Sequence, residues 1–149
     1  MKYPDTIQKL IECFKKLPGV GDKTAERYAL AVLNLDDDIV QLFSESLNNI
    51  KNKIGRCKIC NNLSEGDVCE ICKINDRDKQ TLCVVESPKN VVIFEKLGIY
   101  HGLYHVLDGL ISPLDGKNPE DIKLDLLLNR IEKEEIKEII LALKPGIEG

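Results

Sequence analysis

Two pairs of cysteines constrain the fold of this chain more than any other feature of its sequence. The first pair is Cys57 and Cys60, the second is Cys69 and Cys72, and eight residues separate the pairs. Four thiolates at this spacing can surround one point tetrahedrally, which is the geometry and the ligand type that structural zinc prefers. Two disulfides, or four buried thiols without a metal, are the alternatives. We predict one structural zinc ion, held by four protein sulfurs with no position left for a reacting water.

The chain has the length and composition of an ordinary soluble globular protein. Its 149 residues are 43% hydrophobic and 31% charged, enough for one medium domain or for two or three small ones. No run approaches the ~20 apolar residues that a membrane span needs, and the first residues lack the pattern of a signal peptide. We therefore expect a cytoplasmic protein. Because that compartment is reducing, it favours zinc over disulfides and leaves Cys13 and Cys83 as free thiols.

The net charge of −4 is unevenly distributed along the chain. Residues 1–60 carry ten Lys or Arg against eight Asp or Glu, whereas residues 61–149 carry eleven against seventeen. A polyanion is therefore expected to meet the N-terminal part of the chain.

The first third of the chain is expected to hold two helices joined by a short turn. Apolar residues recur at helical spacing from residue 5 to residue 16, and Leu17–Gly21 interrupts the pattern. Asp22 then fits the N-cap of a second helix over residues 23–33. The pattern predicts a helical hairpin.

Four residues at this hairpin are candidates for contact with DNA. Gly19 and Gly21 let backbone amides and a helix N-terminus approach an anion closely. Lys23 and Arg27 lie four residues apart, on one face of the second helix, where both can reach neighbouring phosphates. Such contacts carry no base readout. The alternative is an ordinary helical hairpin whose glycines only permit a tight turn.

A third helix is expected after the aspartate triplet at residues 36–38. The triplet supplies an N-cap and negative charge at the positive end of the helix. Apolar residues at helical spacing then predict a buried stripe. Its members are Ile39, Leu42, Phe43, Leu47, Ile50 and Ile54.

The second half of the chain alternates strands with helices. The expected strands are 81–86, 104–107 and 138–143, and the expected helices begin at Pro88 and at Pro119. This alternation implies a parallel sheet with helices packed on it. Glu86, which ends the first of these strands, is the carboxylate whose position is most typical of a site. His101 and His105 are expected to be strand-end residues with satisfied ring nitrogens.

Several of these strings, in this order, resemble the RecR family of bacterial recombination mediators. They are Leu17–Ala25, the four cysteines, Val84–Glu86, Tyr104–Gly116 and Glu138–Gly149. The resemblance covers the whole chain. It implies a helix-hairpin-helix region, then a four-cysteine zinc finger, then a Toprim domain, which is an α/β unit with a parallel sheet.

The resemblance also implies the domain boundaries and the fold class. The expected domains are a helical DNA-binding region at 1–55, the zinc finger at 56–74 and the Toprim domain at 79–149. The fold class is therefore α+β with several domains. Members of the family continue past the last residue of this chain, so the Toprim domain is expected to be incomplete at its C-terminal end.

A comparison with catalytic Toprim enzymes bears on activity. Those enzymes hold Mg²⁺ with a glutamate after the first strand and an Asp-x-Asp pair after a later one. Glu86 matches the glutamate, but Lys144 and Gly146 occupy the two aspartate positions, with Glu148 beyond them. Mg²⁺ needs oxygen ligands and a lysine repels it. We therefore expect no enzymatic activity and regard Glu86 as a candidate for partner binding. A Mg²⁺-dependent Toprim nuclease or topoisomerase-like enzyme is the alternative.

The function implied by the resemblance is that of a DNA-binding clamp subunit in recombinational repair. Members of the family act with RecO, and in another assembly with RecF, to help load RecA onto single-stranded DNA coated by SSB. They form dimers and ring-shaped tetramers and bind single- and double-stranded DNA without regard to sequence. We expect a nucleoid-associated location. A zinc-ribbon protein-interaction module that never touches DNA is a further alternative.

Overall fold

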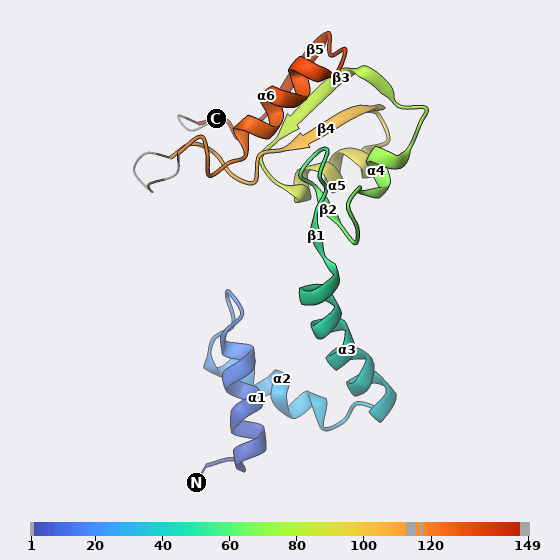
Figure 1. Cartoon of the computed structure of the whole chain (residues 1–149). Coiled ribbons are helices and arrows are strands. Elements are labelled where there is room, and N and C mark those ends of the chain that lie inside the picture. The colour runs from blue at the N-terminus through green and yellow to red at the C-terminus, as the bar shows by residue number, and fades with distance from the viewer. Residues whose placement is uncertain (1, 113–115, 117, 147–149) are drawn as a thin grey trace. The chain divides into compact units, whose positions relative to one another are not determined.

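The computed structural model describes residues 2–112, 116 and 118–146, and the chain divides into two compact units, 1–52 and 53–149. The helices are α1 (Asp5–Lys15), α2 (Asp22–Val32), α3 (Asp37–Lys53), α4 (Glu70–Lys73), α5 (Pro88–Leu97) and α6 (Leu124–Lys133) (Figure 1). The strands are β1 (Gly55–Arg56), β2 (Leu63–Ser64), β3 (Asp78–Val85), β4 (Gly102–Val106) and β5 (Glu138–Ala142). Among the described helices, none is long and apolar enough to cross a membrane.

Helices α1 and α2 pack against each other through a small apolar core. Ile11 of α1 is buried against Ala25 and Ala29 of α2. Both alanines are at most 1% exposed, so the two helices approach closely. The chain reverses between the helices at Gly19, whose φ of +78° lies in the left-handed region that glycine adopts without strain. Both helices predicted for this part of the chain are confirmed.

The predicted N-cap of α2 is wrong by one residue. The helix begins at Asp22, and Gly21 occupies the N-cap position. The Asp22 carboxylate pairs instead with the Lys15 ammonium at 2.8 Å, and the hydrogen bond from Lys15 lowers the pKa of Asp22. Because a glycine N-cap has no side chain to accept a hydrogen bond, the first N–H groups of α2 remain uncapped.

Helix α3 is confirmed, although it begins within the aspartate triplet at Asp37 and not after it, and its apolar stripe is not buried. No residue of this helix is buried by the part of the chain that the structure describes. Leu42, Leu47 and Ile50 are 60%, 57% and 62% exposed. The prediction of a buried stripe is therefore wrong for the single chain. Apolar spacing identifies an amphipathic face, whereas burial also needs a second element to cover that face.

Residues 53–149 contain a parallel sheet of three strands, as predicted, and the structure shows their order to be β4-β3-β5. Helix α5 covers one face of the sheet and α6 covers the other (Figure 1). Side chains alternate along β3, so Cys83 and Val85 pack toward α5 while Leu82 and Val84 pack toward α6. Because β3 is paired on both sides and covered on both faces, its last four residues are all buried.

Local sequence signals set the bounds of α5 but not those of α6. Helix α5 begins at Pro88, as predicted, with Ser87 as its N-cap, and Gly98 ends it in the left-handed conformation. The helix expected from Pro119 begins instead at Leu124, because residues 119–123 form turns. Lys123 has a φ of 57°, which a continuous right-handed helix cannot contain.

His105 on β4 differs from its predicted state. Its side chain is fully buried, and neither ring nitrogen has a hydrogen-bond partner among the described residues. The expected satisfied ring nitrogens are therefore wrong for this residue. Burial, and secondarily the positive charge of Arg130, lower the pKa of His105 to about 4. The imidazole is consequently neutral at pH 7, which reduces the cost of burying it.

Candidate zinc centre and nucleic-acid interface

The four cysteines of the paired motif converge on one point. The Sγ atoms of Cys57, Cys60, Cys69 and Cys72 all lie within 4.8 Å of one another, and all four are free thiols. Sulfurs bound to one zinc ion at about 2.3 Å lie about 3.8 Å apart in a tetrahedron. The observed set therefore needs only a small adjustment to hold one ion. The predicted ligands are brought together, and the donor set fits a closed structural site.

Local backbone structure brings the two cysteine pairs together. The Asn61 N–H donates to the Cys57 carbonyl at 2.9 Å, and Asn61 adopts a φ of 59°, which asparagine tolerates better than most residues. Cys69 is the N-cap of α4, and its N–H donates to the Cys57 sulfur at 3.3 Å. Hydrogen bonds from Cys60 and then Cys72 lower the pKa of the Cys69 thiol. The same contacts raise the pKa values of the Cys60 and Cys72 thiols, so full ionisation of the four sulfurs depends on the metal.

The zinc-binding segment is fixed to the outer edge of β4. The Val106 N–H donates to the Cys60 carbonyl at 2.8 Å, and the Val106 carbonyl accepts a hydrogen bond from Asn61 Nδ2 at 2.8 Å. Just beyond the strand, Arg56 pairs with Asp108 at 2.7 Å. The zinc-binding segment therefore belongs to the same compact unit as the parallel sheet. The spacing of the cysteines does not reveal this connection.

The turn between α1 and α2 is open to the approach of a ligand. A side-chain carbon added to Gly19 or Gly21 would meet no atom within 4 Å. Lys23 and Arg27 are exposed on α2, whereas the alanines of α2 face α1. The Arg27 guanidinium carbon lies 5.5 Å from the centre of the Tyr28 ring. The structure thus places both predicted cations on the helix that begins at the turn. Their contact with DNA stays a prediction.

Glu86 lies at the end of β3 and is half-buried. The three strands are parallel, so their C-terminal ends lie together at one end of the sheet. Asp108 and Lys144, which follow β4 and β5, therefore lie at the same end of the sheet as Glu86. Asp108 is already paired with Arg56. Within the described ranges, the four cysteines are the only group of three or more side chains placed to hold a metal ion. Glu148, the other carboxylate that the sequence offers for a metal site at this end of the sheet, lies outside the described residues.

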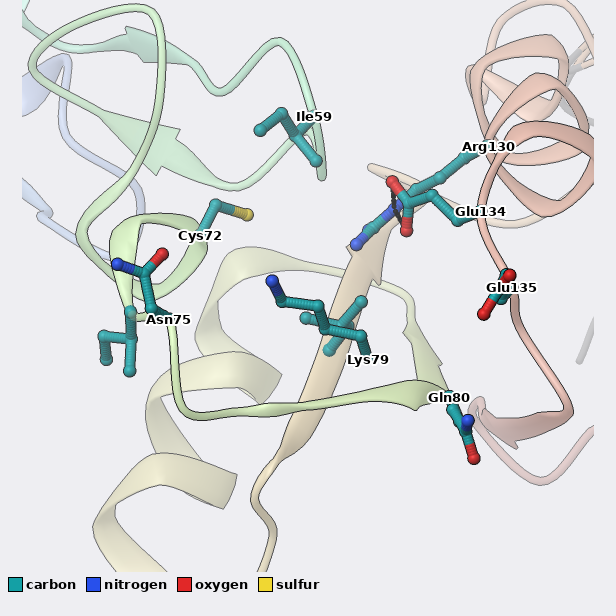
Figure 2. A pocket seen from close by; sticks show the side chains of 10 residues that line it. Ile59, Cys72, Asn75, Lys79, Gln80, Arg130, Glu134 and Glu135 are labelled. Atoms are coloured by element: carbon teal, nitrogen blue, oxygen red, sulfur yellow. Dashed lines mark hydrogen bonds and ion pairs between the residues drawn. The ribbon is translucent and has the colours of Figure 1, made fainter.

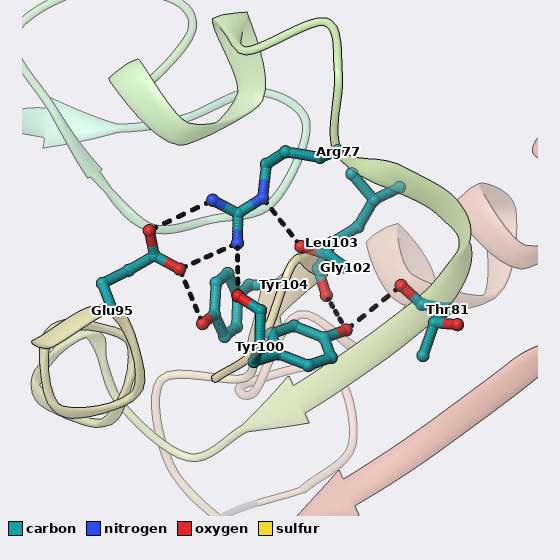
Figure 3. Close-up of polar contacts among 7 residues, drawn as sticks. All are labelled: Arg77, Thr81, Glu95, Tyr100, Gly102, Leu103 and Tyr104. Atoms are coloured by element: carbon teal, nitrogen blue, oxygen red, sulfur yellow. Dashed lines mark hydrogen bonds and ion pairs between the residues drawn. The ribbon is translucent and has the colours of Figure 1, made fainter. Parts of the chain in front are cut away.

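The sequence did not predict an ion pair centred on Arg77 (Figure 3). Arg77 donates to the Glu95 carboxylate at 2.8 and 3.1 Å and to the Gly102 carbonyl at 2.9 Å. The Tyr104 hydroxyl also donates to Glu95 at 2.8 Å, and the Arg77 guanidinium lies 5.4 Å from the centre of the Tyr104 ring. Glu95 and Gly102 are 18 and 25 residues from Arg77 in sequence, so no local pattern could have joined them.

A cavity of about 380 Å³ lies between the second cysteine pair, the start of β3 and the end of α6 (Figure 2). Its walls include Ile59, Ile74, Leu103, Lys79 and Arg130. The Arg130 side chain donates to the Tyr104 carbonyl at 2.6 Å and pairs with Glu134 at 2.9 Å. Cys72 borders this cavity.

Models of known protein families match three consecutive parts of the chain. The RecR helix-hairpin-helix model covers residues 7–51, the RecR zinc finger model, which is defined by four cysteines, covers 54–73, and the Toprim domain model covers 80–149. The chain is 48% identical over 149 residues to the recombination protein RecR of Staphylococcus saprophyticus. It is 47% identical to the RecR proteins of Staphylococcus haemolyticus and Lactobacillus johnsonii. Each alignment covers 100% of this chain and 75% of the relative.

A helix-hairpin-helix region, a four-cysteine zinc finger and a Toprim domain define a class of protein that serves recombination and DNA repair. Within this class, the identity to recombination proteins over the full chain is decisive. The chain belongs to the RecR family. Its four clustered cysteines form the site of one structural zinc ion, as predicted.

Proposed function

We propose that this protein is a non-enzymatic DNA-binding clamp subunit, which acts with RecO and RecF to help load RecA onto single-stranded DNA coated by SSB. Its membership of the RecR family supports the biological role. The single observation that carries the DNA-binding part is the open glycine turn at the start of α2, with two exposed cations on the same helix.

The local geometry explains how the turn would take a phosphate. The N-cap Gly21 leaves the first N–H groups of α2 uncapped, and these groups form the positive end of the helix dipole. Gly19 adds no side chain that would block a phosphate. Lys23 and Arg27 are one helical turn apart, so each can reach a different phosphate. Amides and cations recognise the backbone, and binding would therefore be independent of sequence on single- and double-stranded DNA.

The residues that follow the strands of the Toprim sheet favour partner binding over catalysis. Glu86 is the carboxylate that follows β3, and Lys144 occupies a position where catalytic relatives of this domain have an aspartate. A cation there opposes Mg²⁺ binding. Glu86 is half-buried and is proposed to contact a protein partner. A plasmid-nicking assay with and without Mg²⁺ tests this division of roles. If the unmodified chain cleaves the plasmid and Glu86→Ala does not, the protein is an enzyme and the proposal of a purely DNA-binding role is wrong.

The exposed face of α3 supports assembly into dimers and ring-shaped tetramers. This helix has 17 residues and a continuous apolar stripe, yet Leu42, Leu47 and Ile50 are all more than half exposed. A stripe of this kind is normally covered by another element. The helix-hairpin-helix region of a second subunit would supply that cover.

The DNA-binding part is tested by salt-titrated binding of the variant Lys23→Ala/Arg27→Ala. Loss of two phosphate contacts is expected to reduce the slope of log K against log salt by about 1.4–1.8 and to weaken all sequences equally. Lys89→Ala/Lys96→Ala is the matched control, since it removes two exposed charges from α5. If both double variants change affinity and slope equally, the assignment of the hairpin is wrong.

A further inference from the structure

The four zinc ligands differ in how far solvent can reach them. Cys57, Cys60 and Cys69 are 1%, 1% and 4% exposed, whereas Cys72 is only partly buried. Cys72 also borders the 380 Å³ cavity beside α4, and Figure 2 shows its sulfur directed toward that cavity. Zinc-bound thiolates retain their nucleophilic character, so access decides which of the four meets an oxidant first. We propose that Cys72 is the modification site through which hydroperoxides oxidise the zinc centre and release its metal.

The cavity is suited to a small polar oxidant. A water molecule occupies about 30 Å³, so a space of about 380 Å³ admits a hydroperoxide together with several waters. Ile59, Ile74 and Leu103 form apolar walls of the cavity, and none of these side chains can react with a hydroperoxide in place of Cys72. Of the two cations at the cavity, Arg130 is paired with Glu134, which also lines it, so the positive charge near Cys72 comes from Lys79. Figure 2 shows the Lys79 side chain reaching in the direction of Cys72. A nearby cation stabilises the oxyanion that leaves when a thiolate attacks a peroxide.

The chemistry balances within this cluster. The Cys72 thiolate attacks the distal oxygen of ROOH, an S–O bond forms, the O–O bond breaks, and RO⁻ leaves and takes a proton from water. The resulting sulfenic acid is then attacked by the thiolate of Cys60 or Cys69, each with its sulfur within 4.8 Å. This second step takes up one proton, forms a disulfide and releases water. Two thiolates have lost one electron each and the peroxide has gained two, so only two of the four cysteines would remain to hold a zinc ion.

Loss of zinc would also change the hydrogen bonds of β4, the strand at one edge of the sheet. The Cys60 carbonyl and the Asn61 side chain make the two hydrogen bonds to Val106. Both residues belong to the turn that the metal closes, so their geometry depends on the zinc site. Release of the metal would free the zinc-binding segment from β4 and leave the Val106 N–H without its acceptor. Oxidation at one cysteine would thus be coupled to uncovering of the β4 edge.

The first experiment treats the zinc-loaded full chain with hydrogen peroxide in the presence of dimedone, which traps sulfenic acids. Peptide mass spectrometry with fragmentation then locates the first label among the four ligands. The expected result is label at Cys72 before the other three. Cys13 is an exposed thiol outside the zinc site and serves as an internal reference for reagent access. First label at Cys57, Cys60 or Cys69 would overturn the proposal.

The second experiment changes access without changing a ligand. Ile74→Trp fills the cavity beside Cys72, and zinc release, read with a chromogenic chelator, is expected to slow about threefold or more. Leu63→Trp is the matched control, because Leu63 is 49% exposed, against 43% for Ile74, and borders a second cavity of about 550 Å³ beside Cys69. Its release rate is expected to equal that of the unmodified chain.

Both variants must bind one zinc per chain for the comparison to count. Equal release rates in all three proteins, or slowing by Leu63→Trp alone, would show that the oxidant does not enter beside Cys72. If Ile74→Trp does not fold, the dimedone experiment on the unmodified chain still decides the question.

Discussion

The ion pair between Arg77 and Glu95 makes the sharpest prediction about stability. Arg77→Met keeps the apolar stem of the side chain but removes the guanidinium, whose side chain is only 7% exposed. Breaking a buried pair costs about 3–5 kcal/mol. The Glu95 side chain is 33% exposed, so water would replace part of the lost interaction. We therefore expect the free energy of unfolding to fall by about 2–3 kcal/mol.

The same pair predicts how this loss depends on pH. The hydrogen bond from Arg77 lowers the pKa of Glu95 from its ordinary value of 4.5. A carboxyl group with a lowered pKa in the folded state stabilises the fold above its unfolded pKa, and this stabilisation disappears as pH falls through the folded value. The difference in unfolding free energy between the unmodified chain and Arg77→Met should therefore shrink as pH falls from about 6 to about 3.

Urea unfolding followed by far-ultraviolet circular dichroism, with zinc in excess, measures both effects. Lys73→Met is the control, because Lys73 pairs with Glu70 at 2.6 Å on the surface, where the two side chains are 56% and 89% exposed. Exposed pairs contribute about 0–1 kcal/mol. The reasoning fails if Arg77→Met costs no more than Lys73→Met, or if its cost grows as the solution becomes more acidic.

Three further predictions concern the sheet, the metal and α3. A side-chain carbon on Gly102 would overlap the Tyr100 hydroxyl oxygen and lie 2.7 Å from the Thr81 carbonyl, so Gly102→Ala should lower the melting temperature through a loss of about 1–3 kcal/mol. Zinc chelation, or Cys57→Ala, should lower thermal stability before it alters DNA affinity; lost affinity at unchanged stability would show that the zinc-binding segment itself touches DNA. Leu47→Asp should reduce the mass seen by light scattering without reducing helical content, and an unchanged mass would exclude the α3 face from assembly.

Short-range chemistry explains what could be predicted from the sequence. The spacing of Cys57, Cys60, Cys69 and Cys72 identifies the zinc ligands because a tetrahedral metal site imposes its own geometry. Helix α5 was placed correctly because its N-cap and its C-terminal glycine act within one turn of the residues that they bound. Signals of this kind do not depend on the rest of the fold. The boundaries between the three domains, in contrast, stay a prediction.

Long-range contacts explain what could not be predicted. The ring of His105 is completely buried on β4 and has no hydrogen-bond partner among the described residues, whereas the sequence around it resembles that of any strand end. The sequence around Arg130 is typical of the end of an amphipathic helix, yet the Arg130 side chain donates to the Tyr104 carbonyl, 26 residues away. Apolar spacing in α3 likewise identifies a face without identifying the surface that covers it.

The contacts of Val106 define the mechanical role of the zinc site more closely than the ligand set alone. An edge strand exposes a row of N–H and C=O groups that can pair with another chain. On β4, the outward N–H and C=O of Val106 are both satisfied by the zinc-binding segment, through Cys60 and Asn61. These two residues are positioned by the turn that the metal closes. By closing that turn, zinc would also help to keep the two outward groups of Val106 paired. If oxidation at Cys72 released the metal, as proposed above, Val106 would lose the same two hydrogen bonds, and the end of the β4 edge would be open to pairing with another chain.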